Sequence, residues 1–177
     1  MLRSVDGMTT TDSPTTTTEA LVAVPARFDV EALMPDFYAV VAAVDEAAAA
    51  EAQRAGISPV LADLVRLRAS QLNGCAYCVD LHTRTARRAG ADDQLLQAVA
   101  VWRESGFLTA RERAALALAE SVTRLSETHV PDDVAAAALD TLGEQGTAAV
   151  LAVVVSINAW NALAVTARCW APERRTR

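Results

Sequence analysis

Lysine is absent from this 177-residue sequence, so all sixteen basic residues are arginine. Its absence excludes a lysine nucleophile, a lysine Schiff base and the lysine of a nucleotide-binding P-loop. Acidic residues outnumber basic ones by 22 to 16, which leaves a net charge of −6. Because nucleic-acid-binding domains are normally basic, we expect no nucleic-acid partner.

Cysteine is also scarce, with only three residues in the chain. An odd and small number does not fit a secreted scaffold held together by disulfides. No basic start followed by an apolar run marks a secretory signal either. We therefore predict a cytoplasmic protein whose cysteines are present as thiols.

Strand patterns are missing as well, because no useful length of sequence alternates apolar and polar residues. Residues 1–24 are rich in Thr and are predicted to form a flexible tail, followed by one helical domain over residues 25–177. Typical helix starts lie at Pro35, Ser58-Pro59, Thr109 with Glu112, and Pro131, and typical ends at Gly56, Gly74, Gly90 and Gly143. The sequence thus predicts an all-α domain of six to seven helices with short connections.

The last predicted helix, over residues 145–168, has no charged residue between Gly146 and Ala167. That length could cross a bilayer, but Ser156, Asn158 and Asn161 lie near its middle and favour a buried core helix instead, so we expect no membrane partner. A small domain cannot easily cover every side of such a helix, which predicts an obligate homo-oligomer. Asn158 and Asn161, with Trp160, could anchor that contact or be hydrogen-bonded core amides.

Cys75, Cys78 and His82 form the group of residues best suited to chemistry. Their offsets of three, four and seven place them on one face of a helix. Gly74 puts the cysteine pair at the helix start, where free backbone N–H groups favour a thiolate. His82 lies one turn beyond Cys78 and could act as its base. The i, i+3 spacing also predicts a reversible disulfide between the two cysteines.

Other interpretations of the pair remain open at this stage. A zinc site needs four ligands, and only His82, His129, Cys169 and acidic residues could complete one. Covalent haem attachment would need His in place of Val79, and a thioredoxin fold would need a strand before the motif. Two inert, buried cysteines are a further alternative. We expect a structural or incidental role for Cys169.

The sequence from Leu61 to Thr83, LADLVRLRASQLNGCAYCVDLHT, resembles the carboxymuconolactone decarboxylase superfamily in its AhpD-like alkylhydroperoxidase branch. Later segments agree with the resemblance, which covers about residues 35–168: WRES from Trp102, RERAAL from Arg111 and INAWN from Ile157. The resemblance implies an all-helical domain that assembles into trimers or hexamers. It also implies a peroxide-reducing cysteine pair assisted by a His and an acid.

Residue by residue, the resemblance assigns Cys78 as the attacking thiolate and Cys75 as the cysteine that resolves the oxidised sulfur. Cys75 is expected to be the more exposed of the two. His82 and an acid twelve residues before Cys75 would move the protons. That acid is Asp63 here, where the AhpD-like pattern has Glu, so we expect a longer contact with His82 or a bridging water.

These observations predict a thiol-dependent peroxidase, an oxidoreductase of antioxidant defence that reduces alkyl hydroperoxides. No bound cofactor or metal is expected. The reductant would be an external dithiol, which the resemblance suggests is a dihydrolipoyl group on a partner protein. A redox sensor or binding protein that forms the same disulfide without turnover is one alternative. Lactone decarboxylation is the other, and the cysteine pair argues against it.

Overall fold

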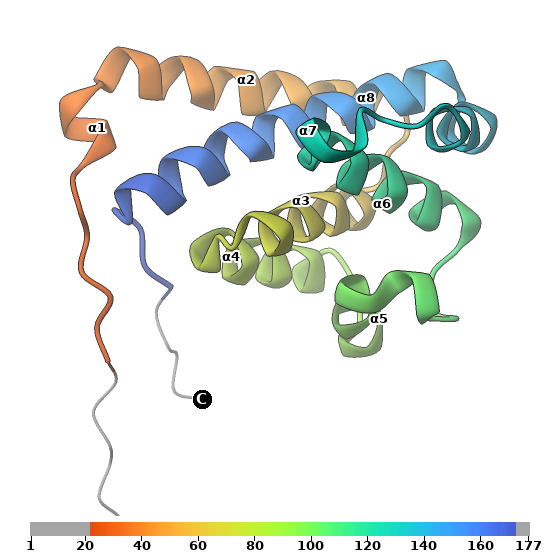
Figure 1. The fold of residues 1–177 in the computed structure, drawn as a ribbon, viewed down its shortest axis with the longest axis horizontal. Helices are drawn as coiled ribbons and strands as arrows, with labels where there is room; N and C mark the ends of the chain where they lie inside the picture. The colour runs from red at the N-terminus through yellow and green to blue at the C-terminus, as the bar shows by residue number, and fades with distance from the viewer. Residues whose placement is uncertain (1–21, 173–177) are drawn as a thin grey trace, which may run out of the picture.

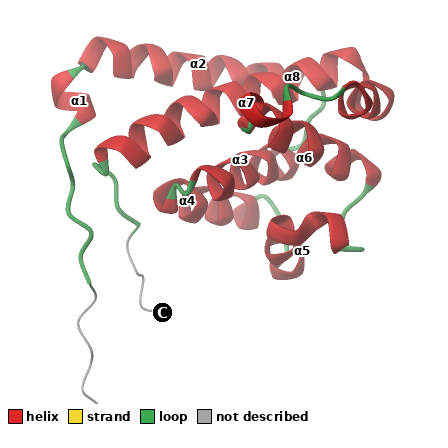
Figure 2. Cartoon of the chain, in the orientation of Figure 1, coloured by secondary structure: helices red, strands yellow, loops and turns green. Residues whose placement is uncertain are grey.

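Helices make up most of residues 22–172, the part of the chain that the computed structural model describes. No strand occurs in this range, which confirms the all-α class (Figure 2). In chain order the elements are α1 (Val30–Leu33), α2 (Pro35–Arg54), α3 (Pro59–Asn73), α4 (Ala76–Arg88), α5 (Asp93–Ala98), the 3₁₀ helix η1 (Val99–Glu104), α6 (Ala110–Thr123), α7 (Leu125–Thr128) and α8 (Asp132–Ala167).

The number of helices needs a correction. Residues 22–172 contain eight α-helices and one 3₁₀ helix, whereas the sequence predicted six to seven helices. The additional ones are α1 and α7, which have four residues each. A single helical turn is too short to show apolar periodicity, so the sequence carries no signal for it.

Two of the predicted helix starts, those of α3 and α6, are confirmed by capping hydrogen bonds. The Ser58 hydroxyl accepts from the backbone N–H of Leu61 at 3.1 Å, and Pro59 occupies the first position of α3. Thr109 and Glu112 form a reciprocal capping box at α6, with backbone N–H to side-chain distances of 2.7 and 3.2 Å. Each cap satisfies backbone donors that have no partner within the helix.

The helix labelled α8 consists of two parts that meet at Gly143. The backbone of Gly143 has φ 73° and ψ 170°, values that only glycine adopts readily. The sequence predicted this division, with one helix starting after Pro131 and ending at Gly143 and another following it. Gly143 therefore sets the direction in which the second, apolar part of α8 enters the fold.

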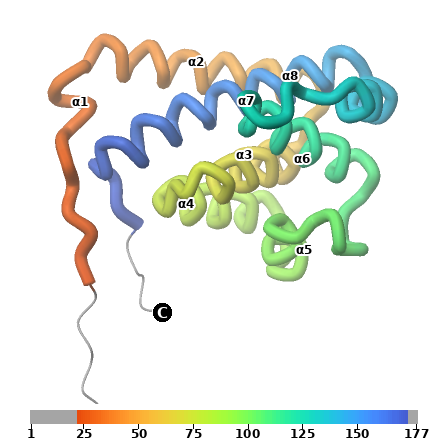
Figure 3. The backbone as a smooth tube through the Cα atoms, viewed as in Figure 1, coloured from red at the N-terminus to blue at the C-terminus, as the bar shows by residue number. Residues whose placement is uncertain are grey.

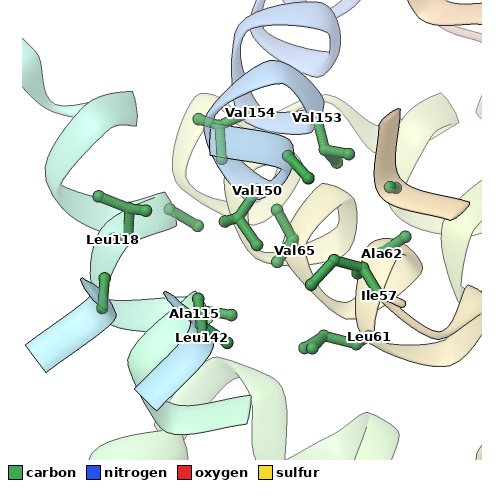
Figure 4. Close-up of a cluster of buried hydrophobic side chains, with 14 residues drawn as sticks. Ile57, Leu61, Ala62, Val65, Ala115, Leu118, Leu142, Val150, Val153 and Val154 are labelled. Carbon is green, nitrogen blue, oxygen red and sulfur yellow. The ribbon is translucent and has the colours of Figure 1, made fainter. Parts of the chain in front are cut away.

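The second part of α8 packs against α2, α3 and α6 (Figure 1). Val150, Val153 and Val154 of α8 belong to one buried cluster with Val65 of α3 and Leu118 of α6 (Figure 4). Burying each such side chain stabilises the fold by about 1.5–3 kcal/mol. An 18-residue stretch of α8 has a mean hydropathy of 2.0 and is apolar enough to cross a bilayer, but here Val150, Val153 and Val154 of α8 are buried in the core of the domain.

The side chain of Glu120 connects α6 to α3 and to η1. Its buried carboxylate accepts hydrogen bonds from Arg68 Nε at 2.6 Å and from Trp102 Nε1 at 2.9 Å, and it pairs with Arg103. Although burial opposes ionisation, these donors hold the pKa of Glu120 below its ordinary value. Part of the WRES segment, Trp102 and Arg103, thus fixes η1 against α3 and α6.

The segment before α1 runs beside the end of α8 (Figure 3). The backbone N–H groups of Arg27 and Phe28 donate to the carbonyl of Ala167 at 2.8 and 3.3 Å. The Arg27 guanidinium donates to the carbonyl of Thr166 at 3.1 Å. These bonds satisfy helix-end carbonyls that would otherwise lack partners. Residues 1–21 of the predicted tail lie outside the described residues.

Candidate functional site

The site is built on the tight turn between α3 and α4. Gly74 ends α3 in the left-handed conformation, with φ 69° and ψ 28°. The next backbone N–H, that of Cys75, donates to the carbonyl of Ser70 at 3.0 Å. The chain therefore reverses within two residues, and α3 and α4 lie side by side. This arrangement brings an acid near the start of α3 close to a residue on α4.

Cys75 lies at the N-cap of α4. Its sulfur accepts a hydrogen bond from the backbone N–H of Cys78 at 3.3 Å. The Cys78 thiol stabilises the Cys75 thiolate most, and Asn161 and nearby backbone N–H groups add to the effect. Burial acts in the opposite direction. The pKa of Cys75 falls to about 7 as a result, so a large share of this cysteine is ionised near neutral pH.

Cys78 is the partner that keeps its proton. The pKa of Cys78 is raised because its thiol donates to Cys75, because it is buried, and because the negative charge of Cys75 opposes a second charge nearby. The expectation that Cys75 is the more exposed cysteine is wrong: 2% of Cys75 and 4% of Cys78 is exposed. Packing of the end of α8 against this turn covers both sulfurs.

Asp63 contacts His82 directly. The Nδ1 atom of His82 lies 3.1 Å from Asp63 Oδ1, so the expectation of a longer contact or a bridging water is wrong. Both side chains are largely buried, with 13% and 12% exposed. When Nδ1–H donates to the carboxylate, Nε2 carries the lone pair and is free to accept a proton.

Arg66 and Asp45 extend this contact into a row of charges. Arg66 lies between the two carboxylates, 3.8 Å from Asp63 and 3.6 Å from Asp45. The hydroxyl of Ser156, on α8, donates to Asp45. Neither Arg66 nor Asp45 was a candidate from the sequence, because Arg66 lies in the Leu61–Thr83 segment without an assigned role and Asp45 meets it only through the packing of α2 against α3.

Hydrogen bonds between side-chain amides connect α8 to the end of α3. Asn73 Nδ2 donates to Asn158 Oδ1 at 2.6 Å and to Asn161 Oδ1 at 2.9 Å. Asn161 Nδ2 donates to the Ser70 hydroxyl at 3.1 Å. The sequence left open whether Asn161 anchors a subunit contact or is a hydrogen-bonded core amide, and its burial shows that it is a core amide. Asn161 also stabilises the Cys75 thiolate.

The two cysteines line different cavities. Cys78 and His82 open onto a cavity of about 250 Å³ whose other lining residues are Tyr38, Asp45, Tyr77, Leu81, Ile157, Trp160 and Trp170. Cys75 opens onto a second cavity of about 330 Å³, which Gly74, Arg27 and Arg168 also line. Tyr77 and Trp170 line both cavities and lie between them. Sequence reasoning missed these aromatic residues, because they come from separate segments.

Two remaining candidates from the sequence lie elsewhere. Cys169 is partly buried near Tyr38 and is not among the residues that line either cavity. His129 ends α7. Within residues 22–172, no group of three or more His, Cys, Asp or Glu side chains is arranged to hold a metal ion.

The fold and the site define a class of protein: an all-helical domain with a buried C-x-x-C pair, a histidine one turn further on and a carboxylate that orients it. The sequence signature of the carboxymuconolactone decarboxylase family matches residues 35–121. The chain belongs to this family, in the superfamily that includes the AhpD-like proteins.

The chain is also similar to two uncharacterized bacterial proteins. An uncharacterized protein of Bacillus subtilis, YdfG, is 31% identical over 113 residues, which is 64% of this chain and 77% of that protein. The uncharacterized protein YnjA of Escherichia coli is 40% identical over 74 residues, or 41% of this chain and 40% of that protein.

Two crystal structures share the fold. One is a protein of unknown function from Agrobacterium tumefaciens, described as a candidate antioxidant defence protein AhpD. It has a TM-score of 0.78 and 31% identity, over 85% of this chain and 100% of that chain. The other is the apo debrominase Bmp8, with a TM-score of 0.57 and 21% identity over 62% of this chain and 58% of that chain. The second likeness concerns the fold alone.

Proposed function

We propose that this protein is a thiol-dependent peroxidase that reduces organic hydroperoxides through the Cys75–Cys78 pair. One observation carries the proposal: Cys78 and His82 line the same cavity, and the neighbouring Cys75, whose pKa is lowered, supplies a thiolate next to Cys78. A thiol that faces a cavity beside a base, with a second thiolate next to it, suits a two-step oxidation to a disulfide. The likeness to a protein described as a candidate antioxidant defence protein AhpD supports the proposal.

In the first step the Cys78 sulfur attacks the terminal oxygen of the hydroperoxide. Its S–H turns from Cys75 to Nε2 of His82, which takes the proton while Asp63 holds the other ring nitrogen. The O–O bond breaks, the sulfur is oxidised to a sulfenic acid, and the departing alkoxide takes the proton from His82 to become an alcohol. Asp63 acts on this step by fixing the tautomer and direction of the imidazole.

In the second step the Cys75 thiolate attacks the sulfur of the Cys78 sulfenic acid. An S–S bond forms, the S–O bond breaks, and the hydroxide takes a proton and leaves as water. Because the pKa of Cys75 is about 7, the thiolate that this step needs is already present near neutral pH. The low pKa of Cys75 therefore serves disulfide formation and not the initial attack.

An external dithiol then restores the pair. We propose that it enters the second cavity and attacks the Cys75 sulfur, which releases Cys78 as a thiol. The second sulfur of the dithiol then displaces Cys75, so the reductant leaves as a disulfide. A dihydrolipoyl group on a partner protein has the required pair of thiols, a 1,3-dithiol that closes to a cyclic disulfide. Such a cycle suits a reducing compartment such as the cytoplasm.

A coupled assay tests this function. Wild-type protein with tert-butyl hydroperoxide and dihydrolipoamide should oxidise the dithiol catalytically, and Cys78→Ser should abolish turnover. Cys169→Ser is the matched control, since Cys169 is outside the set of residues lining either cavity, and it should keep full activity. Disulfide formation without sustained turnover would instead favour a redox sensor.

A further inference from the structure

The cavity at Cys78 has a wall of four aromatic side chains. The chain has only eight aromatic residues, and both tyrosines and two of the three tryptophans gather here. Ring centroids lie 5.3 Å apart for Tyr38 and Trp160, 5.8 Å for Trp160 and Trp170, and 5.9 Å for Tyr77 and Trp170. The rings come from α2, α4, α8 and the segment after α8, which meet at one end of the molecule (Figure 1).

Aromatic walls favour flat or branched apolar groups, because such groups add edge-to-face contacts to the burial of apolar surface. Leu81 and Ile157 complete the apolar part of the lining. Hydrogen peroxide carries no group that could occupy this wall. Binding energy from an apolar group can be used to hold the peroxide oxygen against Cys78, and hydrogen peroxide lacks that contribution.

The size of the cavity sets an upper limit on the substrate. An apolar protein cavity of about 150 Å³ accommodates one benzene molecule. By the same measure the cavity at Cys78, about 250 Å³, has room for about ten non-hydrogen atoms. A benzene ring with a short branched side chain and a hydroperoxide group fits this space, whereas only part of a long fatty-acid chain could be enclosed in it and the rest would extend into solvent.

The charges of the residues that line the cavity also limit which hydroperoxides it can bind. Asp45 contributes a carboxylate to the wall, and the lining residues include no arginine. Arg66 is not among them, pairs with both Asp45 and Asp63, and is only 12% exposed. A hydroperoxide that carried its own carboxylate would therefore meet the Asp45 carboxylate in a lining that offers it no arginine to pair with.

We propose that this cavity selects uncharged aryl-alkyl or compact branched-alkyl hydroperoxides, and that it discriminates against hydrogen peroxide and against fatty-acid hydroperoxides. The inference rests on the proposed peroxidase function and names the substrate class of the same site. Trp170 is the residue that defines the aryl pocket most directly, because its ring contacts those of Tyr38, Tyr77 and Trp160.

Kinetic discrimination tests the proposal. We expect kcat/KM for cumene hydroperoxide to exceed the values for hydrogen peroxide and for linoleic acid hydroperoxide by at least about tenfold. Trp170→Ala should lower the cumene hydroperoxide value about tenfold more than it lowers that for hydrogen peroxide. Phe107→Ala removes an aromatic ring that is 60% exposed and lines neither cavity, so it is the matched control and should change none of the values.

Asp45→Asn tests the charge argument separately. It should raise kcat/KM for an anionic aryl hydroperoxide, such as one with a ring carboxylate, relative to that for cumene hydroperoxide. Equal wild-type values for all the hydroperoxides would overturn the selectivity, and so would an equal loss for every substrate in Trp170→Ala.

Binding without turnover separates this inference from the proposed function. The alcohol product 2-phenyl-2-propanol should bind Cys78→Ser protein in ligand-observed NMR, and Trp170→Ala in the same background should abolish that binding. Alcohol binding without peroxidase activity towards any hydroperoxide would overturn the proposed function and leave the aryl pocket in place. Peroxidase activity without alcohol binding would overturn the aryl pocket alone.

Discussion

Asp63 Oδ1 lies 3.1 Å from Nδ1 of His82, although the AhpD-like pattern has the longer Glu at this position. The contact is possible because the turn at Gly74 packs α3 directly against α4. Arg66 lies 3.8 Å from the same carboxylate oxygen. A shorter acid therefore orients the histidine without an intervening water molecule.

Asp63→Asn should slow peroxide reduction by about 10²–10⁴-fold, the range that a positioned proton-transfer group contributes. The amide can donate to Nδ1 and so favour the tautomer in which Nε2 is no longer a base. Stopped-flow measurement of the oxidation of reduced protein by cumene hydroperoxide gives the rate constant. The pH profile of that rate constant should change as well.

Asp63→Glu is the matched control, because it retains the carboxylate. We expect its rate constant to stay within about tenfold of the wild-type value, since an extra methylene in a buried site carries a packing cost of about 1–3 kcal/mol but leaves the charge in place. An Asp63→Asn protein with an unchanged rate and pH profile would show that Asp63 only stabilises α3.

Cys75 should react with a small alkylating reagent in a pH-dependent manner with a midpoint near pH 7, its own pKa. The thiolate is the reactive form, so the rate should fall about tenfold per pH unit below the midpoint and reach a plateau above it. Cys78 should react only at higher pH, because its pKa is raised. Mass spectrometry of the separate peptides measures both profiles, and denatured protein gives the reference.

The reverse order of the two cysteines, with Cys78 alkylated at lower pH than Cys75, would contradict the assignment of the resting charge. Cys78→Ser provides a further check. It replaces the thiol donor with a hydroxyl donor, so Cys75 should keep a midpoint below that of the denatured protein.

Gly143→Ala should lower the free energy of unfolding by about 1–3 kcal/mol. No atom lies within 4 Å of an added Cβ, so the loss comes from the backbone conformation and not from a clash. Gly106→Ala is the matched control, because it has open space and no positive φ. The control should leave stability unchanged or raise it by up to about 1 kcal/mol. Urea denaturation measures both, and equal effects would contradict the argument.

Light scattering should give a mass that is a multiple of 18.7 kDa, corresponding to a trimer or a hexamer. The outward face of α8 carries Leu151 and Val155, 43% and 52% exposed in the single chain, where a second copy would cover them. Val155→Asp should therefore shift the mass towards the monomer, with an unchanged circular dichroism spectrum. Val101→Asp, at a site 62% exposed on η1, should keep the assembly. A monomeric wild-type protein would contradict this prediction.

The helix pattern could be predicted from the sequence because its signals are local. Ser58-Pro59 and the Thr109/Glu112 capping box act within one turn, and Gly74 and Gly143 act through their own backbone conformations. The i, i+4 relation of Cys78 and His82 is local too, and the structure places both on one cavity. Such features need no knowledge of how distant segments pack.

The rest of the site depends on packing between segments far apart in the sequence. Tyr38 and Trp170 are separated by most of the chain, yet their ring centroids lie 6.1 Å apart. The pKa of Cys75 likewise depends on Asn161, which α8 brings to the turn after α3. Spacing alone indicates neither relationship, which is why the cavity wall was not predicted and why the expectation that Cys78 carries the thiolate was wrong: the pKa of Cys75 is lowered and that of Cys78 is raised.

The most direct test of the account is a single turnover of fully reduced protein with one equivalent of cumene hydroperoxide, followed by mass spectrometry of the cysteine peptides. The account predicts one equivalent of 2-phenyl-2-propanol and a Cys75–Cys78 disulfide in the wild type. In Cys75→Ser it predicts a sulfenic acid on Cys78, which dimedone traps. Alcohol formation with dimedone-labelled Cys75 in Cys78→Ser, or with no oxidation of either cysteine, would contradict the account.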